Sequence, residues 1–541
     1  MDSKQKGMAR REFLASVGHA AGSAAMLRTM AAVGISSVAA ACGSSSASSG
    51  TSPPPSPPPA AVVSPRPGDW PANAGVGKSV VILGGGIAGM TTAFEMNKLG
   101  YTCTILEALP SAGGRNRTLR GGDMAVETDS SQMCMFDLDD DLYFNPGPAR
   151  ISHHHEFLLG YCREFAVALE VFVNDNRAAL IHSTSSFNGQ AQIARRIHAD
   201  TRGYIAELLA SAVNQNALDQ QLTATDKANI LNMLRNVGAL DGGYNYSGTS
   251  RAGFPGQENT GSRQRGEFVS PFLLRDLISD SFLQARADFS HSLNQQATML
   301  QPVGGMDKIA RAFETRVAND IVYEAVVDEV RKTTDGVRIV YQDRFGAAMS
   351  IDADYCICTI PATVLRNIPN DFSAAHQSEI NNFSYAGAGK AAYQSRRFWE
   401  QDHNIYGGIS WTSQDITQIW YPNNGYGNTN GIVVGAYIFG GAAGNNFASE
   451  TPQQRISSVT TQAGNLHSEY ANEVSRGITV SWLKVPFQLG AWGTSTPGVL
   501  LSADENIFFA GEHLSILQGW QEGAILSAYH AIDGVVTRDT A

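Results

Sequence analysis

The sequence has few charged residues, few cysteines and no long run of strongly apolar residues. Only 16% of its 541 residues are charged, and 50 acidic against 39 basic residues give a net charge of −11. This acidic balance disfavours nucleic acids and anionic membrane surfaces as partners. A transmembrane helix needs about 20 predominantly apolar residues, whereas the alanine-rich region ending at Ala41 is interrupted by Arg28, glycines and serines. We therefore expect no membrane-spanning helix there.

Cysteine and histidine spacing gives no metal motif. Apart from Cys42, five cysteines remain, and an odd number argues against a disulfide framework. Cys356 and Cys358 stand two apart in an apolar, strand-like run, which predicts that both face the core. Three consecutive histidines, 153–155, are expected to open a helix, where neighbouring side chains point in different directions. We therefore predict no metal site.

The N-terminal segment is predicted to direct export. Arg10 and Arg11 precede apolar residues in a pattern similar to a twin-arginine signal, which we assign to residues 1–42. Small residues before Cys42 resemble a lipoprotein cleavage box, although alanine stands where leucine is usual, so lipidation of Cys42 and simple release both stay open. Residues 43–75, rich in serine, glycine and proline, predict a disordered linker. The expected location is periplasmic, envelope-anchored or secreted, with membrane contact only through a lipid on Cys42.

Residues 79–117 carry the most informative pattern. A β-branched apolar run precedes Gly84, Gly86 and Gly89 in G-x-G-x-x-G spacing, and a helix-like segment and a second strand follow. Glu107 ends that strand, 23 residues beyond Gly84, where an acid can accept hydrogen bonds from a ribose. This βαβ unit predicts a dinucleotide whose pyrophosphate lies at the helix N-terminus. The alternative is a glycine-rich turn without a ligand.

The residues after Glu107 indicate which dinucleotide. Gly113, Gly114 and Arg115 are followed by Arg117, and two arginines beside flexible glycines suit a pyrophosphate. This order, in which an acid is followed after a short gap by Gly-Gly-Arg, resembles a motif of the flavin amine oxidase superfamily. In that superfamily the arginine helps to hold FAD. The alternative is two solvated arginines on a loop.

The C-terminal segment resembles the closing FAD motif of the same superfamily. A strand runs into Gly511 and Glu512, and Gly519 and Trp520 then open a helix expected to reach about Val535. Glycines at a helix N-terminus permit close approach to a ligand. No cysteine lies between 511 and 520, where a thioether link would be expected, so FAD is predicted to bind non-covalently.

The nearest resemblance is to FAD-dependent L-amino-acid oxidases. It implies that Arg150, ending a Gly-Pro-Ala-Arg motif, binds the substrate carboxylate through its planar guanidinium. Tyr437 would meet the same carboxylate, and Lys390 would hold a water near the flavin. Gly519 would offer its carbonyl to the substrate amine, and Trp520 would line the substrate site. The alternatives are a surface arginine at 150 and a solvated lysine at 390.

The resemblance also implies a set of cofactor contacts. Its members are glycines of the two motifs, the acid after the second strand, and residues beside them. They are Gly84, Gly86, Ile87, Ala88, Gly89, Glu107, Ala108, Gly114, Arg115, Gly147, Pro148, Ala149, Arg150, Val327, Glu512, Gly519, Trp520, Gln521, Glu522, Gly523 and Ala524.

The expected fold is mixed α/β. It combines a Rossmann-type FAD-binding domain of the glutathione-reductase and amine-oxidase type with a β-sheet substrate domain and a helical insert. The FAD-binding domain takes residues 76–135, 301–361 and 480–541. The substrate domain takes residues 136–187 and 362–479. The helical domain takes residues 188–300.

The predicted function is oxidative deamination of L-amino acids by dioxygen, yielding 2-oxo acids, ammonia and hydrogen peroxide. A primary-amine or polyamine oxidase and an amino-acid 2-monooxygenase are alternatives. A non-catalytic exported flavoprotein is an alternative of another class. We expect small-molecule substrates, no nucleic-acid partner and a homodimer.

Overall fold

The computed structural model describes residues 65–218, 221–254 and 266–541. The chain divides into two compact units. The described residues of the larger are 65–176 and 294–541, and those of the smaller are 177–218, 221–254 and 266–293. The predicted signal, 1–42, and the linker up to residue 64 lie outside the described residues. None of the helices in the described ranges is long and apolar enough to cross a membrane.

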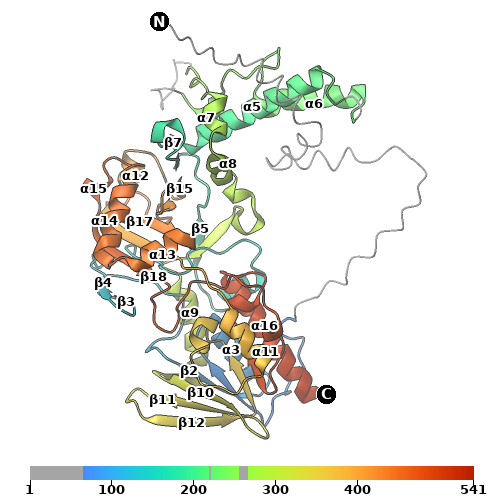
Figure 1. Ribbon diagram of the computed structural model, residues 1–541, viewed down its shortest axis with the longest axis vertical. Helices are drawn as coiled ribbons and strands as arrows, with labels where there is room; N and C mark the ends of the chain where they lie inside the picture. The colour runs from blue at the N-terminus through green and yellow to red at the C-terminus, as the bar shows by residue number, and fades with distance from the viewer. Residues whose placement is uncertain (1–64, 219–220, 255–265) are drawn as a thin grey trace, which may run out of the picture. The chain divides into compact units, whose positions relative to one another are not determined.

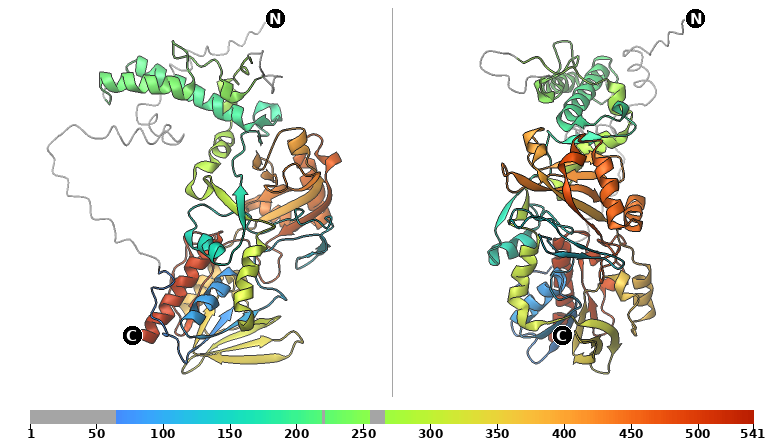
Figure 2. Two further views of the ribbon diagram at one scale, coloured as in Figure 1. Left: turned by 180° about the vertical axis from the view of Figure 1, so that it is seen from behind. Right: turned by 90° about the vertical axis from the view of Figure 1, so that its left-hand side faces the viewer.

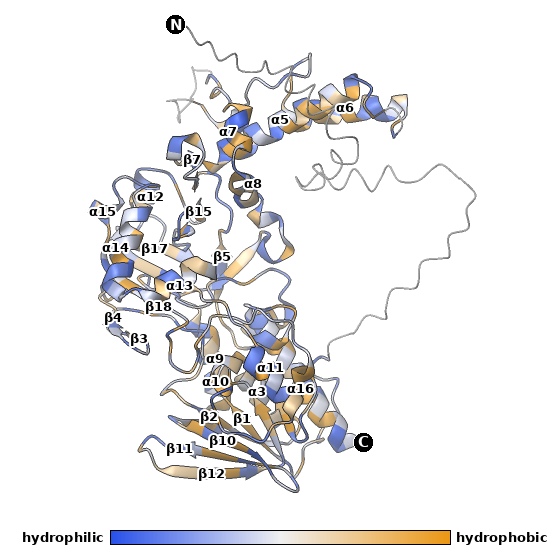
Figure 3. Ribbon diagram, in the orientation of Figure 1, coloured by the Kyte–Doolittle hydropathy of each residue, from blue (hydrophilic) through white to orange (hydrophobic). Residues whose placement is uncertain are grey.

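A parallel sheet of five strands belongs to the larger unit, and Figure 1 labels one of its strands, β2, near α3. In spatial order its strands are β19 (Ile507–Phe509), β13 (Tyr355–Cys358), β1 (Ser79–Leu83), β2 (Thr102–Glu107) and β9 (Ile321–Tyr323). Side chains of β1 alternate, with Val80 and Ile82 in one apolar cluster and Val81 and Leu83 in another. Both faces of the sheet are therefore covered, and Figure 3 shows the hydrophobic colouring of β1 and β2.

Three helices provide the cover on one face. They are α3 (Ile87–Lys98), α9 (Asp307–Val317) and α16 (Gln521–Thr540), and Figure 2 shows α16 beside α3. Trp70, within the last part of the predicted linker, is buried and packs edge-to-face on Tyr529 of α16 at 5.8 Å. The packed body therefore includes residue 70. On the other face lies an antiparallel sheet of β10 (Val326–Lys332), β11 (Val337–Gln342) and β12 (Ala348–Ala353).

A second sheet, largely antiparallel, belongs to the same unit. Its strands there, in order, are β18 (Ser475–Ser481), β14 (Gly389–Arg396), β17 (Asn430–Ile438), β16 (Gln418–Trp420) and β15 (Ile409–Thr412). Its neighbouring helices are α12 (Phe398–Gln401), α13 (Gly441–Ser449), α14 (Pro452–Ala463) and α15 (Tyr470–Glu473). The other elements of the unit are β3 (Met124–Val126), β4 (Ser131–Met133), α4 (Glu156–Glu164), β5 (Leu169–Phe172), β8 (Met299–Pro302), α10 (Ala362–Leu365) and α11 (Ala374–Asn382).

A buried ion pair joins this sheet to the turn after β3. Arg455 of α14 donates to both carboxylate oxygens of Glu127, at 2.7 and 2.9 Å, and Glu127 also accepts from the backbone N–H of Ser481 at 2.7 Å. Both side chains are almost fully buried. Removing one partner would leave an uncompensated charge in the core, which costs about 3–5 kcal/mol.

The smaller unit is mainly helical. Its elements are β6 (Leu180–His182), β7 (Gln192–Ile193), α5 (Ala194–Asn214), α6 (Ala224–Gly238), α7 (Leu274–Ile278) and α8 (Ser281–Ala287). Asp200 of α5 is buried and accepts from the Tyr246 hydroxyl at 2.6 Å and the Phe272 backbone N–H at 2.9 Å. These bonds tie the long loop after α6 to α5. The predicted helical domain, 188–300, overlaps most of this unit.

Two expectations about local structure are corrected. The histidines at 153–155 precede α4, which begins at Glu156. Their neighbouring rings pack edge-to-face, with ring centroids 5.5 and 4.8 Å apart. The last helix begins at Gln521 and continues past Val535 to Thr540. By contrast, the prediction that Cys356 and Cys358 lie in the core is confirmed, since both are buried in β13.

Candidate functional site

A pocket lies at the carboxyl ends of the parallel strands. Gly84 and Glu107 border it after β1 and at the end of β2, Thr359 follows β13, and Gly511 follows β19. Ligands of open α/β sheets bind at this edge, because the loops after the strands converge there. The pocket, bordered entirely by residues of the larger unit, is the candidate cofactor site.

The N-terminus of α3 opens onto this pocket. Its N-cap is Gly86, and no side chain caps the first N–H groups. A Cβ on Gly86 would meet no atom within 4 Å, whereas a Cβ on Gly89 would lie 2.0 Å from the carbonyl oxygen of Gly84. Gly89 thus lets α3 pack against the strand-end turn, and Gly86 leaves space in front of N–H groups that favour an anion.

Glu107 lies in the wall beside this turn. Its carboxylate accepts from the backbone N–H of Gly85 at 2.7 Å and of Leu109 at 2.9 Å. Burial raises the pKa of this carboxyl, and the backbone hydrogen bonds act in the opposite direction. The acid is fixed by backbone donors at the end of β2, and its role toward a ribose stays a prediction.

An ion pair brings the N-terminal and C-terminal motifs together. Nη1 of Arg115 donates to Glu512 Oε1 at 2.7 Å, across 397 positions of sequence, and to the carbonyl of Ala491 at 2.7 Å. Glu512 also accepts from the backbone N–H of Gly519 at 2.8 Å. Arg115 and Glu512 both border the pocket, but Arg117 does not and donates instead to the carbonyl of Met124. Only one of the two expected arginines therefore lies at the site.

Most of the predicted residues meet at this pocket. Those that border it are Gly84, Gly86, Ile87, Ala88, Glu107, Ala108, Gly114, Arg115, Gly147, Pro148, Val327, Tyr437, Glu512, Gly519, Trp520, Gln521 and Ala524. Those outside its border are Gly89, Ala149, Arg150, Lys390, Glu522 and Gly523. Glu522 has another partner, because its carboxylate accepts from the first N–H groups of α4, Phe157 at 3.1 Å and Leu158 at 2.8 Å.

Lys390 of β14 is almost fully buried, which excludes a solvated lysine. Its Nζ donates to the carbonyls of Asn145 at 2.9 Å and Gly147 at 2.7 Å. It also lies 4.3 Å from the ring centroid of Tyr437 on the neighbouring strand β17. Burial, and then the charge of Arg150, lower the pKa of Lys390 well below its ordinary value.

Arg150 follows the same loop and is 8% exposed, which excludes a surface arginine. Its guanidinium carbon lies 4.6 Å from the ring centroid of Trp420, and Nη1 donates to the side-chain oxygen of Asn174 at 3.1 Å. Lys390 Nζ lies 5.3 Å from the same indole. Burial lowers the pKa of Arg150 to about 10. We call Arg150, Lys390, Trp420 and Tyr437 the cation cluster; Tyr437 is its member on the pocket wall.

Trp520 is the N-cap of α16 and borders the pocket. The ring of His155 packs edge-to-face on it at 4.9 Å. His155 is fully buried, and neither of its ring nitrogens has a hydrogen-bond partner among the described residues. Burial and the neighbouring histidines lower the pKa of His155 to about 3. His155 is therefore neutral at ordinary pH and supports the indole by packing.

Sequence reasoning missed several residues of the pocket. They are Thr359, Val364, Ile368, Trp482, Gln488 and Trp492. The signal that could have pointed to two of them is the pair of tryptophans shortly before the closing motif. Trp482 donates to the carbonyl of Pro146 at 2.9 Å, and Trp492 lies 6.2 Å from Phe439. Together with Tyr437 and Trp520 they give this part of the pocket an aromatic lining.

The architecture and the pocket agree with what is found in known proteins. The family of flavin-containing amine oxidoreductases matches residues 87–535. The chain belongs to this family. The ion pair of Arg115 and Glu512 connects the two motifs that resemble the flavin-binding motifs of this family.

Relatives in this family include several L-amino-acid oxidases. YobN of Bacillus subtilis (strain 168), provisionally named an L-amino-acid oxidase, is 25% identical over 487 residues, covering 83% of this chain and 93% of that protein. The L-amino-acid oxidase of Echis ocellatus is 23% identical, covering 84% of this chain and 88% of that protein.

Among solved structures, cyclohexylamine oxidase from Brevibacterium oxydans IH-35A is similar with a TM-score of 0.56 at 15% identity, covering 86% of this chain and all of that one. Putrescine oxidase bound to putrescine is similar with a TM-score of 0.54 at 12% identity, and the match covers 85% of this chain and 99% of that one. The predicted resemblance and the mixed α/β fold class are thus confirmed.

The family implies a flavin, and the pocket fits FAD. The uncapped N-terminus of α3 suits a pyrophosphate, and Glu107 borders the pocket at the end of β2, where an acid would accept from a ribose hydroxyl. Val326, Val327 and Ile368 give an apolar wall. The protein is therefore an oxidoreductase of the flavin amine oxidase family.

Proposed function

We propose that this protein is an FAD-dependent oxidase that deaminates L-amino acids to 2-oxo acids, ammonia and hydrogen peroxide. The observation that carries the proposal is the cation cluster. Arg150 lies against Trp420, and Tyr437 connects the cluster to the pocket wall. A guanidinium in such a desolvated aromatic setting binds a carboxylate strongly, because little water competes for it.

The chain's own residues would bind and orient the substrate. The fork of Arg150 would take both carboxylate oxygens, and the hydroxyl of Tyr437 would donate to one of them. Trp520 would cover the side chain, excluding water from the reacting carbon. When bound, the flavin supplies two-electron oxidation and passes the electrons to dioxygen.

Lys390 has the properties of a proton-transfer group. Two carbonyls hold its Nζ, which leaves one further position on the nitrogen for exchange with a water or the substrate amine. Burial lowers the pKa of Lys390 below its ordinary value, which favours the neutral amine that general base catalysis needs.

We propose that FAD is bound non-covalently. Neither cysteine nor histidine is among the described residues that border the pocket. The free cysteines of the described chain are all buried. Denaturation in acid should release all of the flavin into the supernatant, and flavin that stays with the precipitated protein would contradict this.

An oxidase of amines without a carboxylate is the second candidate. It is favoured because Arg150 is not among the described residues that border the pocket, and because the lining there is aromatic. Such a lining suits an amine with an apolar substituent.

A peroxide-coupled screen of the twenty amino acids against matched decarboxylated amines tests the proposal. We expect turnover of at least one L-amino acid and at least about 100-fold weaker turnover of its amine, because two charge-assisted hydrogen bonds are lost. Product analysis is part of the screen, since an amide would indicate a monooxygenase. Turnover of amines alone would overturn the assignment.

The paired arginines at the N-terminus support a further proposal, that the chain is exported in the folded state. Mass spectrometry of the N-terminus of protein recovered from the producing cells tests it. A mature chain beginning at a lipidated Cys42 would indicate anchoring, and an unmodified start elsewhere would indicate release.

A further inference from the structure

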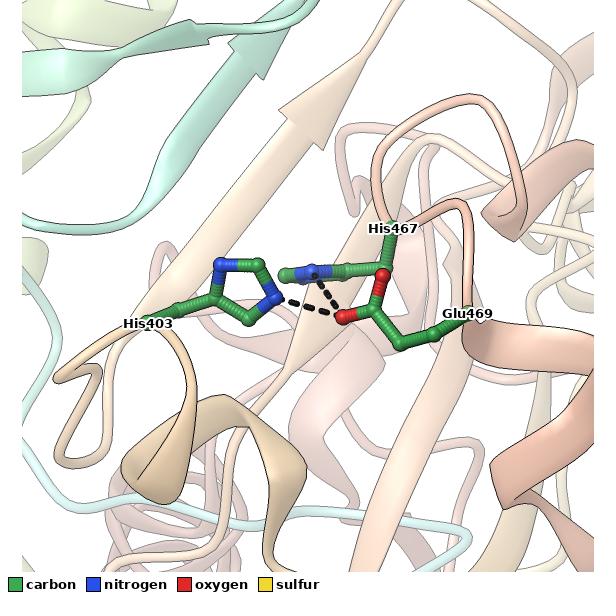
Figure 4. Close-up of side chains that lie close together, drawn as sticks. All are labelled: His403, His467 and Glu469. Atoms are coloured by element: carbon green, nitrogen blue, oxygen red, sulfur yellow. Dashed lines mark hydrogen bonds and ion pairs between the residues drawn. The ribbon is translucent and has the colours of Figure 1, made fainter.

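Three metal-ligating side chains converge beside the second sheet, apart from the flavin pocket. They are His403, in the turn after α12, and His467 and Glu469, in the connection from α14 to α15 (Figure 4). Their ligand atoms all lie within 4.8 Å of one another. The carboxylate oxygen Oε1 of Glu469 accepts from Nε2 of His403 at 2.5 Å and lies 3.7 Å from Nδ1 of His467.

The imidazole of His467 is the second, independent observation. It is fully buried, and its Nδ1 has no hydrogen-bond partner among the described residues. That nitrogen faces the carboxylate and the other imidazole (Figure 4). A buried nitrogen without a partner is costly unless a ligand satisfies it.

A neighbouring hydroxyl prepares His467 to use this nitrogen. Nε2 of His467 lies 2.6 Å from the hydroxyl of Tyr421, which in turn lies 2.6 Å from Oγ of Ser410. When Nε2 carries the proton and donates to Tyr421, Nδ1 has its lone pair available. Metal-ligating histidines are commonly oriented in this way by a hydrogen bond from their other ring nitrogen.

We propose that His403, His467 and Glu469 bind one divalent transition-metal ion, with Zn²⁺ the best fit. Two imidazole nitrogens and one carboxylate oxygen suit Zn²⁺, which takes such ligands at about 2.0–2.2 Å in tetrahedral geometry. Tetrahedral ligands at that distance are about 3.3 Å apart, so the three atoms need shifts of about an ångström. A water completes the fourth position, since the side chains of His403 and Glu469 are partly exposed, at 35% and 27%.

The ion would join two segments that the chain brings together only on folding. His403 follows a short helix, and the other ligands lie more than sixty positions further along. Trp420 ends β16, and Tyr421 follows it and extends the pairing by donating its backbone N–H to the carbonyl of Gly408 at 3.1 Å. Consecutive side chains of an extended segment point to opposite faces. Trp420 belongs to the cation cluster and Tyr421 contacts His467, so the ion would stabilise the reverse face of the sheet that positions Arg150 and Lys390.

Calorimetric titration of the tag-free flavoprotein, after dialysis against a chelator, tests the site. We expect one equivalent of Zn²⁺ per chain with a dissociation constant in the micromolar range or below, and no uptake of Mg²⁺ under the same conditions. At a hundredfold excess over the dissociation constant, Tm should rise by a few degrees.

Variants at the partly exposed ligands keep the test decisive even if a change at buried His467 prevents folding. His403→Ala and Glu469→Gln should each weaken Zn²⁺ binding at least tenfold. Tyr421→Phe should weaken it about 10–100-fold, because it removes only the orienting hydrogen bond. His530→Ala and His153→Ala, at exposed histidines elsewhere, are the matched controls and should bind Zn²⁺ like the unchanged protein.

Two outcomes would overturn the proposal. One is a folded, flavin-loaded protein that takes up less than one equivalent of Zn²⁺. The other is stoichiometric uptake that His403→Ala and Glu469→Gln leave unchanged, or that His153→Ala removes. Neither outcome depends on which amine or amino acid the flavin site oxidises.

Discussion

The flavin pocket and the cation cluster next to it are built in different ways. The part of the pocket that faces a pyrophosphate consists of backbone, with Gly84, Gly86 and the first turn of α3 contiguous in sequence. The cation cluster consists of side chains from distant places, with Lys390 bonded to a carbonyl 245 positions away. The first kind of site needs small residues in a fixed order, whereas the second needs burial that only the assembled sheet provides.

This contrast predicts how the two regions respond to substitution. A change in the backbone turn should alter cofactor binding whatever the substrate. A change in the cation cluster should leave the flavin in place and alter turnover or substrate choice. Four experiments sharpen or break this comparison.

The largest effect is expected in the glycine turn. Gly89→Val should prevent folding or abolish flavin binding, because even a Cβ would lie 2.0 Å from a backbone oxygen. Gly86→Ala is the matched variant, since its added methyl meets no protein atom and enters only the pocket. It should lower flavin affinity at least about 100-fold while the Tm of the flavin-free protein stays within about 2 °C. Flavin fluorescence titration measures the affinity, and thermal melts measure Tm. Unchanged flavin affinity in Gly86→Ala would contradict the placement of the pyrophosphate.

Arg150→Ala should lower kcat/KM for an L-amino acid at least about 100-fold, because charge-assisted hydrogen bonds contribute about 1.5–3 kcal/mol each. Arg150→Lys should recover little of this loss, since an ammonium cannot copy the planar fork. The flavin spectrum is the control and should match that of the unchanged protein. Equal losses for an amine without a carboxylate would show that Arg150 acts by packing and not as the carboxylate ligand.

Lys390→Met should lower kcat about tenfold or more and remove the limb of the pH profile that reports a basic group. The aliphatic replacement keeps the packing on Tyr437 and removes the proton-carrying nitrogen. Rapid reduction of the flavin, followed at a series of pH values, separates this step from oxygen reaction. A pH profile of unchanged shape would assign Lys390 a positioning role through the carbonyls of Asn145 and Gly147.

The smallest effect concerns acid stability. The folded pKa of His155, about 3, lies below the ordinary value of 6.5, so the unfolded chain binds more protons between these values and stability falls as pH falls. This histidine alone should remove about 1 kcal/mol of unfolding free energy between pH 6.5 and 5.5. His155→Phe should make this part of the profile flatter, as measured by chemical denaturation. A profile of equal slope in both proteins would show that His155 is not held neutral.

A structural feature could be predicted from the sequence when the residues that determine it are close together along the chain. The strands β1 and β2 and the helix between them were predictable from hydrophobic runs, glycine spacing and a terminal acid, because a βαβ unit is nearly complete within thirty residues. The ion pair between Arg115 and Glu512 was not predictable, because neither motif contains a signal that it contacts the other. The same reason explains why Arg117, two positions from Arg115, was expected at the pocket and instead donates to the carbonyl of Met124, at the start of β3.

The histidines show the same limit of prediction from sequence. The three consecutive histidines at 153–155 are conspicuous in the sequence, but the sequence does not show that the ring of His155 packs edge-to-face on Trp520. His403 and His467 stand alone in the sequence, so no spacing indicated that they face each other across one carboxylate. Ligand clusters assembled from separate loops have no sequence period and become visible only with coordinates.

The amino-acid sequence by itself determined that this chain folds around a parallel sheet and accommodates a dinucleotide, because turn chemistry and strand periodicity act over a few neighbouring residues. Tertiary structure alone decided which cations are desolvated, which tryptophan they share and which imidazoles meet. Burial and convergence are properties of surfaces brought together from hundreds of residues apart. A residue's type fixes what chemistry it can do, and its surroundings in the folded chain fix the charge and the partner with which it does so.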